Sequence, residues 1–156
     1  IAIITGNFEH YTSRGRLKGF LDAMKEADLI PVDEHIQCGD YSIDGGYEAM
    51  LRIWDTKKRP TAIFISNYDM TIGAYLAINY LNLKIPDDIS VIGFDNFPLA
   101  NVVNPPLSFA EQPTNEMGTE AGKLLYKRIC GDYSDYPQTI MHKPTMYYKE
   151  SIRKIN

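Results

Sequence analysis

Short apolar runs recur along the chain, with helical periodicity between them. The runs begin near residues 1, 34, 61 and 89 and are rich in Ile, Val, Phe or Ala. Continuous apolar runs of this length are typical of strands buried on both faces of a sheet. A spacing of about 27 to 33 residues fits a strand–helix–strand unit. The pattern therefore predicts an α/β domain of three layers, with helices on both faces of a parallel sheet.

The helices between these strands are predicted from apolar stripes at i, i+3, i+4 and i+7. Thr12 or Ser13 is expected to cap the first of them, and Pro31 lies beyond its end. The stripes consist of Leu17, Phe20, Leu21 and Met24; of Tyr47, Met50, Leu51 and Trp54; and of Ile72, Tyr75, Leu76, Ile78 and Leu81.

The rhythm changes after residue 95. A loop rich in Pro and Asn, residues 96–106, leads into an extended stretch at 107–112. Asn115 is expected to cap one further helix, which Gly131 ends. Residues 139–151 are rich in Tyr, Thr and Met and predict one or two added strands.

Composition limits the function classes. A length of 156 residues predicts one domain or one large subdomain, and no apolar stretch approaches the roughly 20 residues of a membrane span. The net charge of -4, with 16 dispersed Lys and Arg, argues against this chain gripping a phosphate backbone unaided. The densest basic run, residues 57–59, precedes a proline and is interpreted as a solvated turn.

No motif supports catalysis or metal binding. The two cysteines form no CxxC pair, which favours reduced thiols in a cytoplasmic protein, and the three histidines are isolated. Neither a GxSxG elbow nor a phosphate loop is present. The sequence therefore predicts a protein that is not an enzyme and has no cofactor.

Polar side chains follow every predicted strand. In open α/β sheets, ligands bind at the carboxyl ends of the parallel strands. Amides and carboxylates together satisfy hydroxyl groups, and an aromatic ring covers the apolar face of a pyranose or a purine. Loops at strand ends are polar in any case, so the pattern favours ligand binding without excluding a purely structural role. The strand exits read Thr5-Gly6-Asn7, Gly39-Asp40-Tyr41, Ser66-Asn67-Tyr68-Asp69 and Asp95-Asn96, and the fifth run ends at Gln112.

Four segments resemble repressors of the LacI/GalR family. Residues 12–20 resemble that family's Arg-x-x-Gly-Phe segment, and residues 60–67 its "PTAI…N" strand. Residues 85–96 are similar, almost residue for residue, to "VPDDISVIGFDD", and residues 105–112 to "PPLTTVxQ". The resemblance covers nearly the whole chain in order. It implies the C-terminal lobe of an incomplete, periplasmic-binding-protein-like class I effector-binding domain.

The resemblance also implies residues that bind an effector. Arg16 would clamp hydroxyls or carboxylates, with a solvated position on the helix surface as the competing role. Tyr41 would stack on the ligand or simply pack against the lobe. Asn67 and Asp95 would bond ligand hydroxyls, with turn formation as the competing role. Further candidates are Thr12, which offers a hydroxyl, and Gln112, which touches the effector or reports closure.

Departures from the family pattern leave the effector unidentified. Tyr68 stands between Asn67 and Asp69, where many relatives read "ND", and Asn96 replaces the commoner second aspartate. The closing "R-x-S" appears as Lys149-Glu150-Ser151.

The resemblance divides the chain into three parts. Residues 1–112 would form the C-terminal lobe, residues 113–137 a crossover helix of the N-terminal lobe, and residues 138–156 a return to the first lobe. The rest of that lobe and a DNA-binding headpiece are expected to precede these residues in a complete protein. The apolar face of the crossover helix, with Met117, Leu124 and Leu125, would then lack its normal partners.

The implied function is effector sensing by a cytoplasmic, homodimeric transcription repressor. Operator DNA would be bound only through the N-terminal headpiece, and no membrane would be involved. A solute-binding protein of a sugar transporter is the alternative, and an enzyme on a flavodoxin-like sheet is a third, weaker one. The implied dimer interface comprises Met70, Ile72, Tyr75, Leu76 and Phe97.

Overall fold

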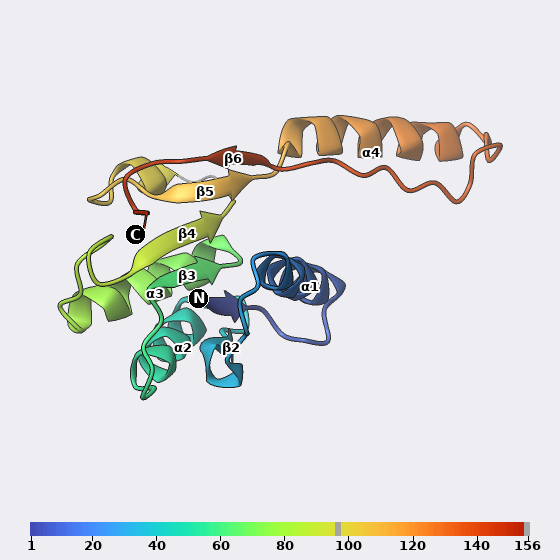
Figure 1. The fold of residues 1–156 in the computed structure, drawn as a ribbon. Coiled ribbons are helices and arrows are strands. Elements are labelled where there is room, and N and C mark those ends of the chain that lie inside the picture. The colour runs from blue at the N-terminus through green and yellow to red at the C-terminus, as the bar shows by residue number, and fades with distance from the viewer. Residues whose placement is uncertain (96–97, 155–156) are drawn as a thin grey trace.

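Six strands form one sheet in the order β2–β1–β3–β4–β5–β6 in the computed structural model, which describes residues 1–95 and 98–154 (Figure 1). The first five pair in parallel, and β6 runs antiparallel to β5. The predicted parallel α/β sheet is confirmed, with one antiparallel edge strand added. The strands are β1 (Ala2–Thr5), β2 (Ile36–Cys38), β3 (Ala62–Ile65), β4 (Ser90–Phe94), β5 (Ser108–Glu111) and β6 (Thr145–Tyr147).

Helices connect the parallel strands. The path from β1 to β2 crosses the sheet in one direction, and the paths from β2 to β3 and from β3 to β4 run in the other. Right-handed connections therefore place the first helix on the opposite face from the next two. The helices are α1 (Tyr11–Glu26), α2 (Ile43–Trp54), α3 (Tyr68–Tyr80) and α4 (Thr114–Ile129), with short 3₁₀ turns at Asp33–His35 and Pro98–Asn101.

The core lies between the sheet and the pair α2 and α3. Glycines allow these two helices to touch through their backbones. A Cβ atom at Gly73 would lie 1.9 Å from the carbonyl oxygen of Ile43, and one at Gly46 would lie 2.4 Å from that of Met70. Close approach at these two positions requires glycine.

Burial on both faces is confirmed for β1, in which all four residues are buried. For β3 the prediction of burial on both faces is wrong. Ile63 and Ile65 are buried, whereas Ala62 and Phe64 are only partly buried. The face that carries Phe64 is shared with Phe94, and their ring centroids lie 6.3 Å apart, edge to face. The face of the sheet that α1 covers is therefore less fully buried than the face that α2 and α3 cover.

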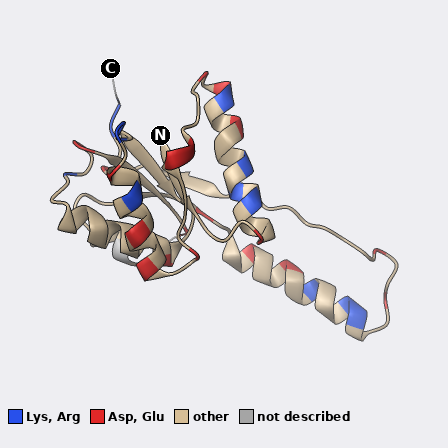
Figure 2. Ribbon diagram, turned by 90° about the horizontal axis from the view of Figure 1, so that it is seen from below, with Lys and Arg blue, Asp and Glu red and all other residues tan. Residues whose placement is uncertain are grey.

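Helix α4 projects away from the body as an arm, and the chain returns beside it to β6 (Figures 1 and 2). No described residue of α4 is buried. Lys and Arg gather toward its far end (Figure 2). There the side chain of Arg128 pairs with Asp135, at 2.7 Å, and its Cζ lies 5.6 Å and 5.4 Å from the ring centroids of Tyr133 and Tyr136. The tip of the arm is thus held by contacts among its own side chains.

Two of the predicted helix caps are wrong. The N-cap positions of α1 and α4 are His10 and Pro113, and neither side chain caps its helix. The hydroxyl of Thr12 bonds Tyr41 instead, because α1 begins at Tyr11, before the expected cap. The predicted stop at Gly131 is confirmed: its φ is 80°, and its N–H donates to the carbonyl of Arg128.

Ser151 joins the segment after β6 to the strands β4 and β5. Its Oγ donates to the carbonyl of Val91 at 2.7 Å and accepts from the backbone N–H of Ser108 at 2.7 Å. Ser151 is fully buried. One side chain therefore joins the end of the chain to both β4 and β5.

Candidate ligand-binding site

The ring of Tyr41 lies against the exit of β1. A Cβ atom at Gly6 would lie 2.2 Å from two of its ring atoms, so glycine is what lets the ring settle there. Its hydroxyl bonds Ser13 Oγ at 2.6 Å and Thr12 Oγ1 at 2.9 Å, and the ring of His10 meets it edge to face at 5.8 Å. The backbone of Tyr41 is left-handed, with φ of 58°. Tyr41 and Thr12 are therefore fixed together beside the start of α1.

Arg16 is directed from α1 onto the ends of β3 and β4. Its guanidinium donates to the carbonyl of Ser66 at 2.5 Å, and its Cζ lies 3.9 Å from the centroid of the Phe94 ring. A cation over an aromatic face is held by the quadrupole of the ring. Arg16 is partly buried, so the solvated helix residue that competed with the binding role is not what the structure contains.

Asn67 occupies the N-cap of α3. Its Oδ1 accepts the backbone N–H of Met70 at 2.9 Å, which is the local structural role that competed with ligand binding. The cap uses the oxygen of the amide, and its Nδ2 bonds no residue that the structure describes. Asn67 thus stands at the carboxyl edge of the sheet with one of its two polar atoms used by the fold.

Asp95 and Gln112 follow the neighbouring strands β4 and β5 and bond each other. Gln112 Nε2 donates to Asp95 Oδ1 at 2.6 Å. The backbone of Asp95 is left-handed, with φ of 75°, and its N–H donates to the carbonyl of Ala110 at 2.8 Å. A non-glycine residue with a left-handed backbone is uncommon and has a conformational cost. The hydrogen bond between Asp95 and β5 offsets this cost here.

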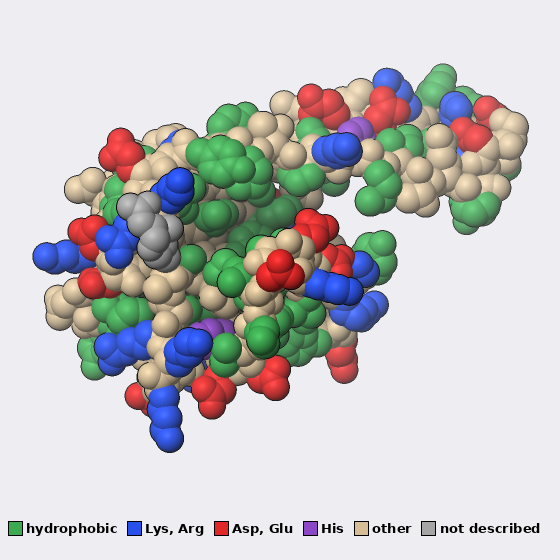
Figure 3. Space-filling model, in the orientation of Figure 1, with side chains coloured by type: hydrophobic (Ala, Val, Ile, Leu, Met, Phe, Trp, Pro, Cys, Tyr) green, Lys and Arg blue, Asp and Glu red, His purple; other side chains and the backbone are tan. Residues whose placement is uncertain are grey.

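A hollow of about 360 Å³ lies where these strand ends meet the base of the arm, which is within the size range of small-ligand sites. Apolar side chains gather on this side of the molecule (Figure 3). Three predicted residues, Thr12, Arg16 and Gln112, line it together with Phe94; Tyr41, Asn67 and Asp95 do not. The remaining wall consists of Tyr11, Gly15, Pro113, Met117, Ile140, Met141, His142 and Pro144.

Sequence reasoning missed Phe94, Met117 and the stretch 140–144 as lining residues. Phe94 ends an apolar strand, so its position at the carboxyl edge was the available signal. The stretch 140–144 carried no such signal, because the arm brings it to the hollow from 45 or more residues further along the chain.

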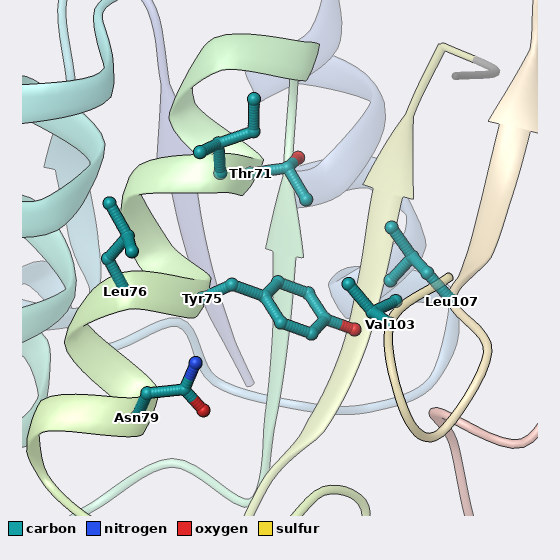
Figure 4. A pocket seen from close by; sticks show the side chains of 7 residues that line it. Thr71, Tyr75, Leu76, Asn79, Val103 and Leu107 are labelled. Carbon is teal, nitrogen blue, oxygen red and sulfur yellow. The ribbon is translucent and has the colours of Figure 1, made fainter. Parts of the chain in front are cut away.

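A second, apolar pocket lies on the outer side of α3 (Figure 4). The side chain of Tyr75 points from α3 toward Val103, with Leu107 beyond it and Thr71, Leu76 and Asn79 along the helix. The Tyr75 hydroxyl is buried without a hydrogen-bond partner among the described residues. Burial raises the pKa of this hydroxyl well above its ordinary value.

The predicted dimer residues separate in the structure. Ile72, Tyr75 and Leu76 line the outer pocket, and Leu76 is 51% exposed. Met70 is fully buried in the core, so its assignment to a surface interface is wrong. Met70 faces α2, because the side of α3 that carries it packs into the core. Phe97 lies outside the described residues.

Within residues 1–95 and 98–154, no cluster of three or more His, Cys, Asp or Glu side chains is arranged to hold a metal ion. In the same part of the chain, no helix is both long enough and apolar enough to cross a membrane.

Comparison with known proteins agrees with this architecture. A family model described as a periplasmic binding protein-like domain matches residues 1–152. The HTH-type transcriptional repressor PurR of Proteus mirabilis is 39% identical over 152 residues, 97% of this chain and 44% of that protein. The chain spans about half the length of the curated relatives it matches.

Solved structures give the same result. A regulatory protein of the LacI family from Chloroflexus aggregans is 31% identical, with a TM-score of 0.84 over 97% of this chain and 54% of that one. The transcriptional regulator CelR in complex with cellobiose is 27% identical, with a TM-score of 0.87 over 96% and 46%. These matches confirm the resemblance that the sequence segments indicated.

Proposed function

Because the chain belongs to the family of periplasmic binding protein-like domains, we propose that it is the effector-sensing part of a DNA-binding transcription repressor. The observation that carries the proposal is the hollow at the carboxyl edge of the sheet, lined by Arg16, Thr12, Gln112 and Phe94. The curated relatives are repressors, which supports this function over that of a transporter's solute-binding protein. The part described here binds its effector and does not transform it.

The proposed effector is a small, polar, sugar-like molecule. Arg16 offers directed donors, Gln112 both a donor and an acceptor, and Asp95 a carboxylate beside them. Phe94 and the apolar wall suit the less polar face of a ring. Tyr41, Thr12 and Asn67 are proposed to complete the site around the same edge. Cellobiose in complex with CelR is consistent with a sugar in this kind of domain.

Residues 1–112 are proposed to form one lobe of the sensor and residues 113–137 a crossover helix of the other lobe, with residues 138–156 returning to the first. The arm supports this division, since α4 projects from the body with Met117 and Leu125 exposed. A second lobe packed on α4 would cover those side chains and close the hollow. An effector that prefers one closure state then changes operator affinity, because ligand can shift an equilibrium only by its differential affinity.

The complete protein is proposed to be a cytoplasmic homodimer that binds operator DNA through an N-terminal headpiece. Helix α3 supports dimerisation through its outer face. It has one charged residue, Asp69, and is apolar on both sides, a pattern expected of a helix that is covered all round. Ile72, Tyr75 and Leu76 are the residues proposed for that interface.

Calorimetry on the full-length protein tests effector binding, with a panel of monosaccharides and disaccharides that includes cellobiose. Arg16→Ala is expected to weaken the affinity for the bound sugar about 10-fold or more, because it removes a charged donor. Arg14→Ala is the matched control. Arg14 lies on the same helix, and among the described residues its guanidinium donates only to the carbonyls of Phe8 and Glu9. Unchanged affinity in Arg16→Ala, or equal loss in both variants, contradicts the site.

Light scattering tests the dimer. Leu76→Arg places a charge on the apolar face of α3 and is expected to shift the protein toward monomer. Ile30→Arg, at a position 88% exposed after α1, is the control and leaves the mass unchanged. A Leu76→Arg protein that stays dimeric contradicts the proposed interface.

A further inference from the structure

The arm is joined to the body through a short junction at its root. β5 ends at Glu111, and Pro113 is already the N-cap of α4. Gln112 is the residue between them, and its carbonyl accepts the backbone N–H of Thr114 at 2.8 Å. Because no described residue of α4 is buried, packing does not set the direction of the helix. The direction is set at the root.

Two side-chain hydrogen bonds secure this root, and they do different things. The hydroxyl of Tyr147 bonds the carboxylate of Glu111, which raises the pKa of Tyr147 and joins β6 to β5. That bond connects the two strands that lead to and from the arm. The bond from Gln112 Nε2 to Asp95 Oδ1 instead connects the root to β4, in the body of the sheet. It is charge-assisted and short, at 2.6 Å.

We infer that Gln112 is a positioning residue that couples the effector site to the arm by orienting the Asp95 carboxylate. This inference rests on the proposed function and deepens it, since it concerns regulation of the same site. Gln112 lines the hollow and bonds Asp95, so its side chain belongs to the site and to the root of the arm at once. A carboxylate accepts several hydrogen bonds, so Asp95, which lies beside the hollow through its bond to Gln112, has the capacity to accept an effector hydroxyl while Oδ1 holds Gln112.

The backbone makes Asp95 a firm anchor for this bond. Its N–H extends the ladder between β4 and β5 by one bond, to Ala110, and holds its backbone at a φ of 75°. An effector hydroxyl that donates to the carboxylate therefore acts on a group already tied to the arm. The direction of α4 and the occupancy of the hollow become linked through one side chain.

Hydrogen exchange on the unliganded full-length protein tests whether the hydrogen bond between Gln112 and Asp95 holds the start of α4 to the sheet. Gln112→Met keeps the length of the side chain and removes the amide. Asp95→Gly removes the carboxylate at a backbone position that glycine tolerates. Each variant is expected to raise exchange of the amides of residues 112–117 about 10-fold, and the double variant no further, because both remove the same bond. Additive effects, or exchange like that of the wild type, overturn the inference.

Asn115→Leu is the matched control. It removes an exposed amide three residues away, whose side chain bonds no described residue, and leaves exchange at the root unchanged. A rise equal to that of Gln112→Met would mean that any change at the start of α4 loosens the root, which also overturns the inference.

Gln112→Glu supplies a readout that a merely structural role would not move. It places two carboxylates side by side, which cannot both ionise without repulsion. Exchange at the root, corrected for its intrinsic pH dependence, is expected to be raised at pH 7. It should return toward wild type as the pH is lowered, because a proton shared by the two carboxylates removes their repulsion. The absence of this pH dependence contradicts the direct bond.

The experiments distinguish a failure of the proposed effector binding from a failure of the coupling through Gln112. If no sugar of the panel binds the wild-type protein, the proposed function fails, while the exchange experiments on the unliganded protein still decide the tie. If cellobiose or another sugar binds, Gln112→Met is expected to weaken its affinity about 10-fold, since Asp95 is no longer oriented. Binding with wild-type affinity in Gln112→Met overturns the coupling and leaves the effector site standing.

Discussion

The guanidinium of Arg16 lies over the ring of Phe94, with its Cζ 3.9 Å from the ring centroid. This contact joins the middle of α1 to the last residue of β4, 78 positions further along the chain. Together with the bond to Ser66, it sets the direction of the guanidinium at the edge of the hollow. If the hollow binds the proposed effector, Phe94 is therefore expected to influence binding through Arg16 as well as through its own surface.

Phe94→Leu is expected to weaken effector affinity about 3-fold to 10-fold, because it retains an apolar side chain and loses the cation–π contact. Calorimetry with the sugar bound by the wild type measures this. Phe64→Leu is the matched control, since that ring meets Phe94 and no arginine. Equal losses in the two variants would mean that packing of the apolar face, and not the arginine contact, is responsible.

Gly73→Ala is expected to destabilise the protein by about 3 kcal/mol, because the new Cβ would lie 1.9 Å from the carbonyl oxygen of Ile43 and force α2 and α3 apart. Chemical denaturation measures the loss. Gly118→Ala, in α4, is the opposite control: nothing lies within 4 Å of its Cβ position, and alanine favours a helix by about 0.5 to 1 kcal/mol. If both changes were neutral or destabilising alike, the close contact of the two helices would be in doubt.

Ser151→Ala is expected to cost about 2 kcal/mol of unfolding free energy, since it leaves the buried N–H of Ser108 and the carbonyl of Val91 without their partner. Thermal denaturation followed by circular dichroism measures this. Ser134→Ala removes an exposed hydroxyl at the tip of the arm and is expected to change stability much less. A Ser151→Ala protein as stable as the wild type would show that the two hydrogen bonds of Ser151 Oγ do not contribute to stability.

The tip of the arm is expected to be stable to acid until very low pH. Hydrogen bonds from Lys127 and Arg128 lower the pKa of Asp135 to about 2. A lowered pKa stabilises the folded tip above the ordinary value of about 3.9, and this contribution is lost as the pH falls through about 2. The NMR signals of the Tyr133 and Tyr136 rings, which flank Arg128, report the transition.

Asp135→Asn is expected to abolish that transition, whereas Asp28→Asn, at the turn after α1, leaves it in place. A midpoint near pH 4 in the wild-type protein would mean that the carboxylate of Asp135 is not held by its two cations.

Much of the fold follows from the sequence, because it depends on local periodicity. The strands β1, β3 and β4 and the helices α1 to α3 lie where the apolar spacing predicts them. Alternation of strand and helix leaves a parallel, right-handed arrangement as the simple solution. The polar strand exits, and with them Arg16 and Gln112 at one edge, follow from the same rule.

Roles that depend on the rotation of a helix were not accessible in this way. Apolar residues surround α3 on both sides, so its spacing alone does not separate Met70, which packs against α2, from Leu76, which faces outward. The use of the Asn67 oxygen as a cap likewise depends on where α3 begins.

The sequence by itself determined the order of elements, the edge of the sheet at which the polar strand exits gather and the family resemblance, since each resides in short segments. Only the tertiary structure decided that Arg16 meets Phe94, that Asp95 bonds Gln112, and that residues 140–144 reach the same hollow. These contacts join positions far apart in the chain, and their geometry depends on strand register and on the direction of the arm. No local pattern of residues encodes either quantity.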